Sequence, residues 1–500
     1  MISYMYKNTS VPEKKMPMDI GIIHFVGIGG IGMSGIAEIL HNLGYQVTGS
    51  DINSNANTQR LAKLGIRIFT GHDASNVNDV AVVVKSTAVP LTNPEILEAR
   101  KSQVPVVRRS EMLAELTHLK ATIAVAGSHG KTTTTSLVGH MLVAANLDPT
   151  VINGGIINTY GTNVHLGEGD WIVTEADESD GTFIRIPATI GIVTNLDPEH
   201  LDYWSNYDSL VDGFKSFIQN LPFYGSAILC FDHPKLRELS ANIQDRRIIS
   251  YAIDNKDADI IATNISFDED GSHFDIEILR NPINDKPRII KNIFLPIHGK
   301  HNILNSLAAV GVAVELKLSD ETIERALREF SGVKRRFTKI AEINDIIIID
   351  DYAHHPVEIK ATLSAAKNVT KCADKKGKVI AVMQPHRYSR LENLFVEFVE
   401  CFKDADKVVI TDVYAAGEKP IKGVNKDTLV EAINNSGIEA YALDKDDNLQ
   451  SLVSEIANPC DIVVCMGAGN ITQMANDLAE KMTNKLSGST GSTGNLCVVK

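Results

Sequence analysis

Short apolar runs alternate with helical patterns along most of the chain. Ile22–Val26 has the composition of a buried strand and leads into a cluster of glycines. Apolar residues in Ile36–Leu40 then indicate a helix, while Tyr45–Asp51 and the β-branched run Val80–Val84 indicate further strands. Strands that alternate with helices in this way predict a parallel sheet with helices on its faces.

The same pattern starts again twice. Thr122–Ala126 leads into a second glycine loop and a helix from about Thr132, and two later runs extend that sheet, Trp171–Val173 and Ile190–Val193. A third series contains Ile346–Asp350, Val379–Met383, Val408–Ile410 and Ile462–Val464. The sequence therefore predicts an α/β protein of three domains in series. We expect them at residues 1–118, 119–328 and 329–486, followed by a flexible Gly/Ser/Thr-rich tail at residues 487–500.

Length and composition agree with this organisation. A chain of 500 residues is too long for one hydrophobic core and suggests roughly three domains. The formal net charge of −13 argues against a nucleic-acid partner. We also expect no membrane segment and no signal peptide, because no run of about 18 apolar residues occurs and the N-terminus is polar. Six scattered cysteines without a CxxC pair are typical of reduced thiols in a cytoplasm.

The first glycine loop, Gly27–Gly32, fits the pattern G-x-G-x-x-G between a strand and a helix. Glycines allow a tight turn and let backbone N–H groups approach a diphosphate, and the helix N-terminus adds partial positive charge. Asp51 ends the next strand, where dinucleotide-binding folds carry an acid that binds a ribose. The loop predicts nucleotide binding without distinguishing NAD from a UDP-sugar.

The second glycine loop, Gly127–Thr133, follows a strand, opens a helix and contains Gly-Lys-Thr. In such a loop the backbone amides and Lys131 hold the β- and γ-phosphates of ATP, and the hydroxyl of Thr132 reaches Mg²⁺. Val125 stands where the G-x-x-x-x-G-K-[ST] pattern has its first glycine. The loop nevertheless predicts an enzyme that uses ATP and magnesium.

Two segments rich in acids, Glu175–Asp180 and Asn195–Asp202, each follow a predicted strand directly. Ligands bind at the carboxyl ends of strands in open parallel sheets, and carboxylate oxygens suit Mg²⁺. Each acid alone is about equally well explained as a solvated loop charge. Together with a phosphate loop, the two segments predict a metal site, and this setting makes His200 a candidate ligand.

Taken as an ordered set, these segments resemble the Mur ligase family. The resemblance runs from about His24 to Asn470. The motifs that carry it are His24–Gly35, Gly127–Thr133, Glu175–Asp180, Thr194–Asp202, His301–Asn305, Gly332–Phe337, Asp350–Pro356 and Gln384–Arg390.

The resemblance implies both a fold and a reaction. The fold has a Rossmann-like N-terminal domain for a UDP-sugar, a central P-loop ATPase domain with a mostly parallel sheet, and a Rossmann-like C-terminal domain for an amino acid. The first glycine loop would then bind a UDP-sugar rather than NAD. The reaction is the addition of L-alanine to the lactoyl carboxylate of UDP-N-acetylmuramate, with ATP and Mg²⁺, through an acyl phosphate. A cytoplasmic monomer or weak homodimer is expected.

The resemblance also implies roles for particular residues. Those expected to contact the UDP-sugar are Gly27, Gly29, Gly30, Gly32, Met33, Ser34, Asp51, His72, Ser86, Thr87 and Arg108. Those expected to contact ATP are Gly127, Ser128, His129, Gly130, Lys131, Thr132, Thr133, Asn302, Asn305, Arg336 and Asp351. The expected metal ligands are Thr132, Glu175 and His200, and the expected amino-acid site consists of Tyr352, His355, His386 and Arg387. The residues expected to take part in catalysis are Lys131, His200, Arg336 and His355.

Three alternatives stay open at this point. One is a ligase that adds a whole tripeptide to the same UDP-sugar, although that branch usually carries an aromatic residue where Ser179 stands. Another is an NAD-dependent oxidoreductase that uses Gly27–Gly32 and Asp51, which would leave Lys131 unexplained. The third is a non-catalytic nucleotide-binding scaffold, which the intact Gly-Lys-Thr disfavours.

Overall fold

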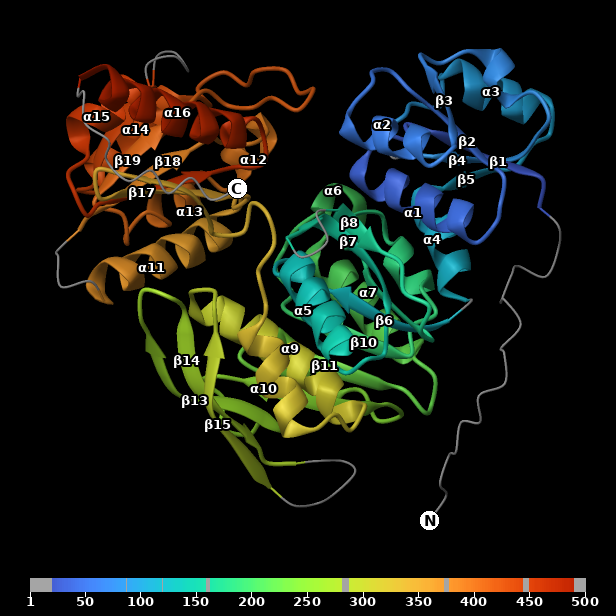
Figure 1. Cartoon of the computed structure of the whole chain (residues 1–500), viewed down its shortest axis with the longest axis horizontal. Helices are drawn as coiled ribbons and strands as arrows, with labels where there is room; N and C mark the ends of the chain where they lie inside the picture. Colours follow the sequence, from blue (N-terminus) through green and yellow to red (C-terminus); the bar gives the residue numbers. More distant parts are fainter. Residues whose placement is uncertain are drawn as a thin grey trace. The chain divides into compact units, whose positions relative to one another are not determined.

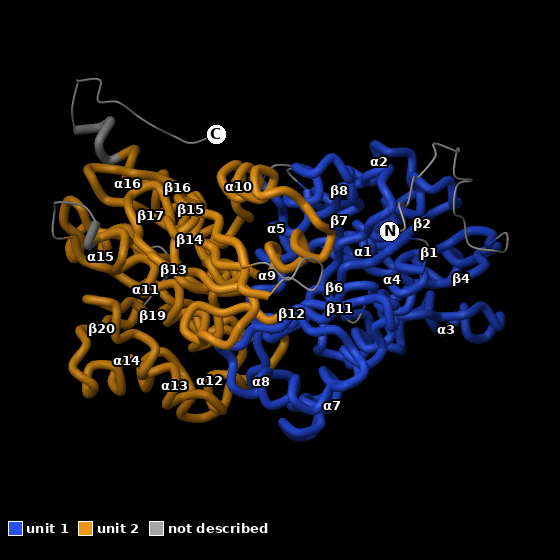
Figure 2. Tube along the Cα trace, turned by 90° about the horizontal axis from the view of Figure 1, so that it is seen from below, with its two compact units in different colours: residues 1–249 blue, residues 250–500 orange. Residues whose placement is uncertain are grey.

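A computed structural model describes residues 20–86, 88–118, 120–158, 162–280, 287–372, 377–443 and 449–489. The chain divides into two compact units, unit 1 up to Ile249 and unit 2 from Ser250 (Figure 2). The division falls within strand β12 (Arg247–Ala252).

The first sheet of unit 1 has five parallel strands in the order β3-β2-β1-β4-β5. They are β1 (Ile22–Val26), β2 (Val47–Asp51), β3 (Arg67–Thr70), β4 (Val80–Lys85) and β5 (Val106–Arg108). The helices of this region are α1 (Ile31–Asn42), α2 (Ala56–Lys63), α3 (Pro94–Lys101) and α4 (Arg109–Thr117) (Figure 1). The strand order reverses between β1 and β4, and ligands of open α/β sheets bind at the carboxyl ends of strands at such a point.

Unit 1 also contains strands in the order β11-β10-β6-β9-β7-β8, which are parallel except for β8. They are β6 (Ala121–Ala126), β7 (Thr150–Ile157), β8 (Thr162–His165), β9 (Trp171–Glu175), β10 (Ile190–Val193) and β11 (Ser226–Cys230). The α-helices here are α5 (Lys131–Ala144), α6 (Leu201–Trp204), α7 (Tyr207–Gln219) and α8 (Pro234–Ala241). The central strand β6 is buried from Thr122 to Ala126 and points its carboxyl end into the second glycine loop.

Unit 2 begins with an antiparallel region. Strand β13 (Ile260–Phe267) is parallel to β12, whereas β14 (Ser272–Ile278) and β15 (Arg288–Leu295) continue in antiparallel order. Two helices follow, α9 (Lys300–Glu315) and α10 (Asp320–Arg328). Helix α9 is buried along nearly its whole length, as its apolar sequence requires.

A six-stranded sheet completes unit 2, in the order β16-β17-β21-β18-β19-β20, with β16 antiparallel to β17 and the other pairs parallel. Its strands are β16 (Thr338–Ile343), β17 (Ile346–Asp351), β18 (Val379–Met383), β19 (Lys407–Ile410), β20 (Glu439–Ala442) and β21 (Ile462–Met466). Its helices are α11 (Pro356–Cys372), α12 (Tyr388–Asn393), α13 (Phe395–Glu400), α14 (Lys426–Asn435), α15 (Leu449–Ile456) and α16 (Ile471–Ser489).

The predicted α/β class is confirmed, because parallel strands alternate with helices in three successive regions. The antiparallel strands β13–β15 had not been predicted. Residues 490–500 of the expected tail lie outside the described residues, and α16 extends to Ser489. Among the helices of the described residues, none is both long enough and apolar enough to cross a membrane.

Candidate nucleotide and substrate sites

The second glycine loop connects β6 to α5 and needs glycine at two positions. Gly127 has φ +128° and Gly130 has φ +81°, a region that side-chain-bearing residues rarely adopt. A Cβ on Gly127 would also lie 2.1 Å from Oγ1 of Thr194. The loop ends at the N-terminus of α5, where backbone N–H groups and the helix dipole favour an anion.

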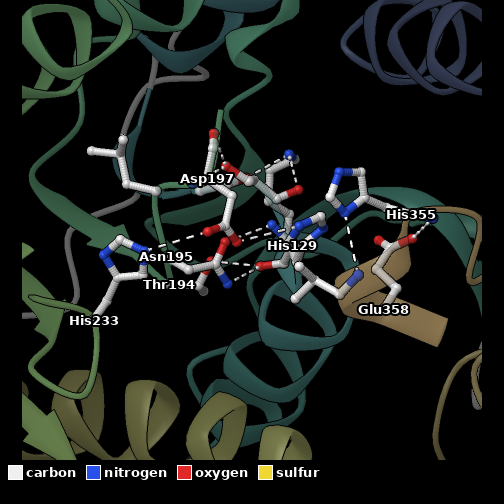
Figure 3. A network of polar contacts seen from close by, with 12 residues as sticks. His129, Thr194, Asn195, Asp197, His233, His355 and Glu358 are labelled. Atoms are coloured by element: carbon white, nitrogen blue, oxygen red, sulfur yellow. Dashed lines mark hydrogen bonds and ion pairs between the residues drawn. The ribbon is translucent and has the colours of Figure 1, made fainter. Parts of the chain in front are cut away.

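Polar side chains at the end of β10 hold this loop in place (Figure 3). Oγ1 of Thr194 donates to the carbonyl oxygen of His129 at 2.6 Å. The amide of Asn195 accepts from the backbone N–H of His129 at 2.8 Å and donates to its carbonyl at 3.0 Å. The backbone N–H of Asp197 donates to Oγ of Ser128 at 2.8 Å. These four contacts all lie within unit 1.

Lys131, the first residue of α5, is paired with Glu178. Its Nζ lies 2.9 Å from each carboxylate oxygen of Glu178 and donates to the carbonyls of Gly127 and Ser128 at 2.5 and 3.1 Å. The Glu178 side chain is completely buried. Burial opposes the charge on Lys131, but the carboxylates of Glu178 and Asp177 outweigh it and raise the pKa of Lys131. The ammonium is therefore retained in this buried position.

Glu178 also belongs to a group of side chains that can hold a metal ion. One ligand atom from each of Glu178, Glu199 and His200 lies within 4.8 Å of the other two. His200 reaches this position through a left-handed backbone conformation at the start of α6, φ 55°. Glu175, expected from the resemblance as a ligand, accepts from the backbone N–H of Gly154 at 2.8 Å. Thr132, the other expected ligand, is buried in the first turn of α5.

A cavity of about 220 Å³ in unit 1 lies between the end of the first glycine loop and the second sheet. Its lining includes Gly32 after the first loop, Arg109 at the start of α4, and Asn153, Glu175 and Asp177 from the second sheet. Arg109 forms an ion pair with Asp177 at 3.4 Å. Asp177 directly precedes Glu178, the residue that pairs with Lys131.

The first glycine loop is held by Asp51. The backbone N–H of Gly29 donates to Oδ2 of Asp51 at 2.8 Å, and that of Gly27 donates to the carbonyl of Ser50 at 2.8 Å. A Cβ on Gly29 would meet this carboxylate at 2.8 Å, and one on Gly32 would meet Arg109 at 2.7 Å. The glycines at these two positions therefore allow close approach of neighbouring polar groups.

Other residues expected at the UDP-sugar site differ in their exposure. Met33 and Ser34 are buried in α1. Ser86 follows β4, and its backbone N–H donates to the carbonyl of Val26 at 3.1 Å. Arg108 ends β5 and its side chain is exposed. Thr87 lies outside the described residues.

In unit 2, the residues expected to bind adenosine lie on α9 and at the end of β17. Asn302 and Asn305 are both buried, and Asn302 donates to the carbonyl of His298 at 2.8 Å. Asp351 accepts from the backbone N–H groups of Phe337 and Ala353, each at 2.7 Å. Burial raises the pKa of Asp351 to about 6, against the opposing charge of Arg336.

The expected amino-acid residues form an aromatic and cationic cluster in unit 2. The guanidinium of Arg336 lies 5.3 Å from the ring of Tyr352. The His386 ring stacks on Tyr414, with centroids 5.4 Å apart and an interplanar angle of 10°. The backbone N–H of Arg387 donates to the carbonyl of Tyr414 at 2.9 Å, which fixes this stack. Burial lowers the pKa of His386 to about 4.

His355 lies at the start of α11 in the same unit. Its backbone N–H donates to the carboxylate of Glu358 at 3.2 Å, an interaction drawn in Figure 3. Its side chain is buried, and Nδ1 accepts weakly from the backbone N–H of Val357 at 3.4 Å.

Three family models match successive parts of this chain. They are described as Mur ligase family, catalytic domain, which matches residues 22–121, Mur ligase middle domain, residues 125–313, and Mur ligase, glutamate ligase domain, residues 335–469. The chain belongs to the Mur ligase family. The resemblance stated from the motifs is thereby confirmed.

Similarity to named Mur ligases extends over almost the full length. A UDP-N-acetylmuramate–L-alanine ligase of Parvibaculum lavamentivorans is 54% identical over 473 residues, which cover 94% of this chain and 95% of the relative. The enzyme of the same name from Rhodospirillum rubrum is 53% identical over 470 residues, 94% and 96% of the two chains. A solved UDP-N-acetylmuramate–alanine ligase from Thermotoga maritima is 30% identical, with a TM-score of 0.76 and coverage of 93% and 99%. Membership of a family of ligases disfavours the oxidoreductase and scaffold alternatives.

Several residues that the sequence motifs did not single out lie beside the predicted site residues in the structure. Arg109 was passed over in favour of its neighbour Arg108. Glu178 lay inside a recognised acidic segment, but only the fold shows that it pairs with Lys131. Tyr414 belongs to no motif that we recognised, and its contact with His386 joins segments that are 28 residues apart in sequence.

Proposed function

We propose that this chain joins L-alanine to the lactoyl carboxylate of UDP-N-acetylmuramate, with conversion of ATP to ADP and phosphate. The observation that carries the proposal is a phosphate loop already formed in unit 1, in a chain 54% and 53% identical to relatives named for that reaction. Since the reaction consumes ATP, we place it in the cytoplasm, as a step in the synthesis of peptidoglycan precursors.

The phosphate loop supplies much of the charge that the reaction requires. A carboxylate is a poor electrophile, so the γ-phosphate first moves to the lactoyl carboxylate and gives an acyl phosphate, which the amine of L-alanine then attacks. Both partners in the first step are anions, so alignment and charge neutralisation dominate. The N–H groups at the start of α5 and the ammonium of Lys131 serve this purpose in unit 1. Arg336 is the proposed second cation, in unit 2.

The acidic group in unit 1 fits a magnesium ion. Two carboxylates converge with His200, and carboxylate oxygens are the ligands that Mg²⁺ prefers. A bound Mg²⁺ would neutralise part of the charge on the phosphate oxygens. Thr132, Glu175 and His200 stay the ligands proposed from the resemblance, and we add Glu178 and Glu199 because their oxygens lie beside His200.

The cavity between the glycine-loop regions suits the reacting part of the UDP-sugar. The first loop would hold the diphosphate, and Gly32 extends from that loop to the cavity wall. Asp177 on the opposite wall lies close enough to Lys131 for its charge to raise the pKa of the lysine. A carboxylate in this cavity would therefore approach the transferred phosphate, and Arg109 offers it a cationic partner.

The amino acid is proposed to bind at the cluster in unit 2. Arg387 is a natural partner for its carboxylate, since a guanidinium forms paired hydrogen bonds with that group. Burial lowers the pKa of His386 to about 4, so the ring is neutral near pH 7 and can accept a hydrogen bond from an ammonium rather than repel it. Tyr414 limits the space beside it, and Tyr352 is the further residue proposed from the resemblance to limit the size of the amino-acid side chain.

Phosphate release tests the proposal directly. ATP, Mg²⁺ and UDP-N-acetylmuramate are supplied with L-alanine, glycine, L-serine or the tripeptide, and controls omit the UDP-sugar or the amino acid. We expect release that depends on both the UDP-sugar and L-alanine, with the corresponding amide product identified by mass. A preference for the tripeptide would contradict the amino-acid assignment, and no release with any acceptor would contradict the proposed reaction.

A further inference from the structure

A buried carboxylate beside the first sheet has no role in the chemistry described so far. Glu95 lies in the first turn of α3, and its side chain is completely inaccessible to solvent. Its Oε2 accepts from Oγ of Ser50 at 2.6 Å and lies 3.0 Å from Nδ1 of His72, while its Oε1 accepts from the amide of Asn76 at 2.6 Å. His24, also fully buried, lies 3.7 Å away.

This carboxylate is ionised at neutral pH. Burial alone would raise its pKa, but the nearby His24 and the hydrogen bonds from Ser50 and Asn76 outweigh burial and lower the pKa of Glu95 to about 2. An ionised carboxylate only accepts hydrogen bonds, so each polar hydrogen nearby must point toward it. A buried anion with this many donors orients its partners strongly.

The hydrogen bonds around Glu95 determine which ring nitrogen of His72 carries a hydrogen. The single proton of Ser50 is used in the 2.6 Å bond to Glu95, so the Ser50 oxygen offers His72 only lone pairs. Nδ1 of His72 lies 3.0 Å from that oxygen and 3.0 Å from Oε2 of Glu95. Both neighbours are acceptors, so Nδ1 must be the donor. The other ring nitrogen, Nε2, then faces away from this network.

His72 is placed where Nε2 can meet a ligand. It follows β3, at the carboxyl edge of the parallel sheet, and its side chain is 14% exposed. Ser50 connects the network to the first glycine loop, because its carbonyl accepts from the backbone N–H of Gly27 at 2.8 Å. Within the described part of the chain, no residue forms a hydrogen bond or ion pair with Nε2 of His72.

We propose that Glu95 is a positioning residue for the UDP-sugar site: it holds His72 with hydrogen on Nδ1 and so directs Nε2 toward the bound UDP-sugar. The inference rests on the proposed function, since that function supplies the ligand. Ser50 completes the arrangement by using its hydroxyl proton on Glu95 rather than on His72. The neighbouring histidine His24 is fully buried, so it serves the network from inside and does not meet the ligand.

A first experiment reads the hydrogen on His72 without any substrate. Long-range ¹H–¹⁵N spectra of protein labelled with ¹⁵N-histidine distinguish the two ring nitrogens, and loss of one signal set in His72→Asn assigns the residue. We expect hydrogen on Nδ1 in the unaltered chain. In Glu95→Gln, the new amide can donate to Nδ1, so hydrogen should move to Nε2. An Nε2–H signal for neutral His72 in the unaltered chain would overturn the proposal.

A second experiment measures binding of UDP-N-acetylmuramate by calorimetry in the absence of ATP. Glu95→Gln should weaken binding roughly tenfold, the effect of losing about one well-placed hydrogen bond. Glu98→Gln is the matched control, because Glu98 lies on the same helix and contacts only Lys101 and Ser102 in the described structure. That control should bind as the unaltered chain does. Equal affinity of Glu95→Gln and Glu98→Gln would overturn the proposal.

A double variant separates positioning from general destabilisation. If Glu95 acts through His72, Glu95→Gln should cause no further loss of affinity in a His72→Asn background. Additive losses would show that Glu95 acts by another route and would contradict the inference. Failure of the unaltered chain to bind the UDP-sugar would contradict the proposed function instead, while the spectra would still test the orientation of His72.

Discussion

Replacing Lys131 by methionine removes the ammonium that pairs with Glu178 in unit 1. The Glu178 side chain is completely buried and lies 2.9 Å from Nζ of Lys131 at each oxygen. Removing one partner of a buried ion pair leaves the other charge uncompensated and costs about 3–5 kcal/mol of unfolding free energy. For a unit of this size, that loss corresponds to a decrease in melting temperature of roughly 6–20 °C.

The same change should abolish phosphate release, so stability and catalysis must be separated. Glu178→Gln removes the buried carboxylate charge that Lys131→Met would leave without a partner. We therefore expect the double variant Lys131→Met/Glu178→Gln to regain most of the lost stability, to within about 1–2 kcal/mol of the unaltered chain. It should stay inactive, because the cation that meets the transferred phosphate and one of the proposed Mg²⁺ ligands are both missing.

Thermal unfolding and phosphate release are measured on the same samples. The matched control is Lys235→Met, which removes an ion pair of 3.0 Å with the largely exposed Glu238 on α8 in the same unit. Exposed pairs contribute only about 0–1 kcal/mol, so this control should melt nearly normally. A Lys131→Met variant as stable as the control, or a double variant no more stable than the single one, would refute the reasoning.

The pH of the experiment follows from the raised pKa of Lys131. A lysine whose folded-state pKa lies above its unfolded value contributes stability that is fully present below the unfolded pKa, about 10.4, and is lost as the pH rises through the folded pKa. The pair is therefore intact in ordinary assays near pH 7–8. The stability that Lys131 contributes to the unaltered chain should be constant in that range and be lost only in strong alkali.

Three further outcomes are expected. Gly127→Ala should weaken ADP binding in calorimetry and cost about 2–5 kcal/mol of unfolding free energy, because φ is +128° and the new Cβ would lie 2.1 Å from a hydroxyl oxygen. The control Gly65→Ala, where φ is +97° and the space is open, should cost only about 1–3 kcal/mol. Equal costs would contradict this. Tyr414→Ala, which removes the ring stacked on His386, should reduce the kcat/KM preference for L-alanine over larger amino acids about tenfold in competition assays. Burial raises the pKa of Asp351 to about 6, so the folded state binds the carboxyl proton more tightly than the unfolded state does. The contribution of Asp351 to the free energy of unfolding should therefore fall as the pH rises from about 4 to 6. Asp351→Asn should flatten that part of the plot of unfolding free energy against pH.

The fold was predictable wherever the sequence pattern is local. Strands of parallel sheets are buried on both faces and therefore appear as continuous apolar runs, as in β6 and β18. The antiparallel strand β14 alternates buried and partly buried residues along Ser272–Ile278, so it contains no continuous apolar run. Its two-residue period is the signal that would have predicted it.

The glycine loops were found for a similar reason. A positive φ is a requirement of single residues, so the glycines of the second loop appear in the sequence whatever surrounds them. The contacts that hold the loop are different in kind. Thr194 and Asn195 reach His129 across more than sixty residues of chain, through the pairing of β10 with β6. No local pattern specifies that pairing, so these contacts required the fold.

Buried acidic residues were the hardest feature to predict, because the sequence alone does not distinguish them from acids that are exposed to solvent. Glu95 and Glu178 nevertheless share a local arrangement. Each lies in the first turn of a helix that is capped by an Asn or Asp side chain. Asn93 accepts from the backbone N–H of Glu95, and Asp177 accepts from the backbone N–H of Ser179. The cap fixes where the turn begins, and in α3 the partial positive charge at the helix N-terminus also favours the carboxylate of Glu95. An Asx residue followed within two positions by glutamate in a βα connection is therefore a signal worth weighing for a buried acid. Glu98, one turn later on α3, lies outside that arrangement and pairs with Lys101 near the surface.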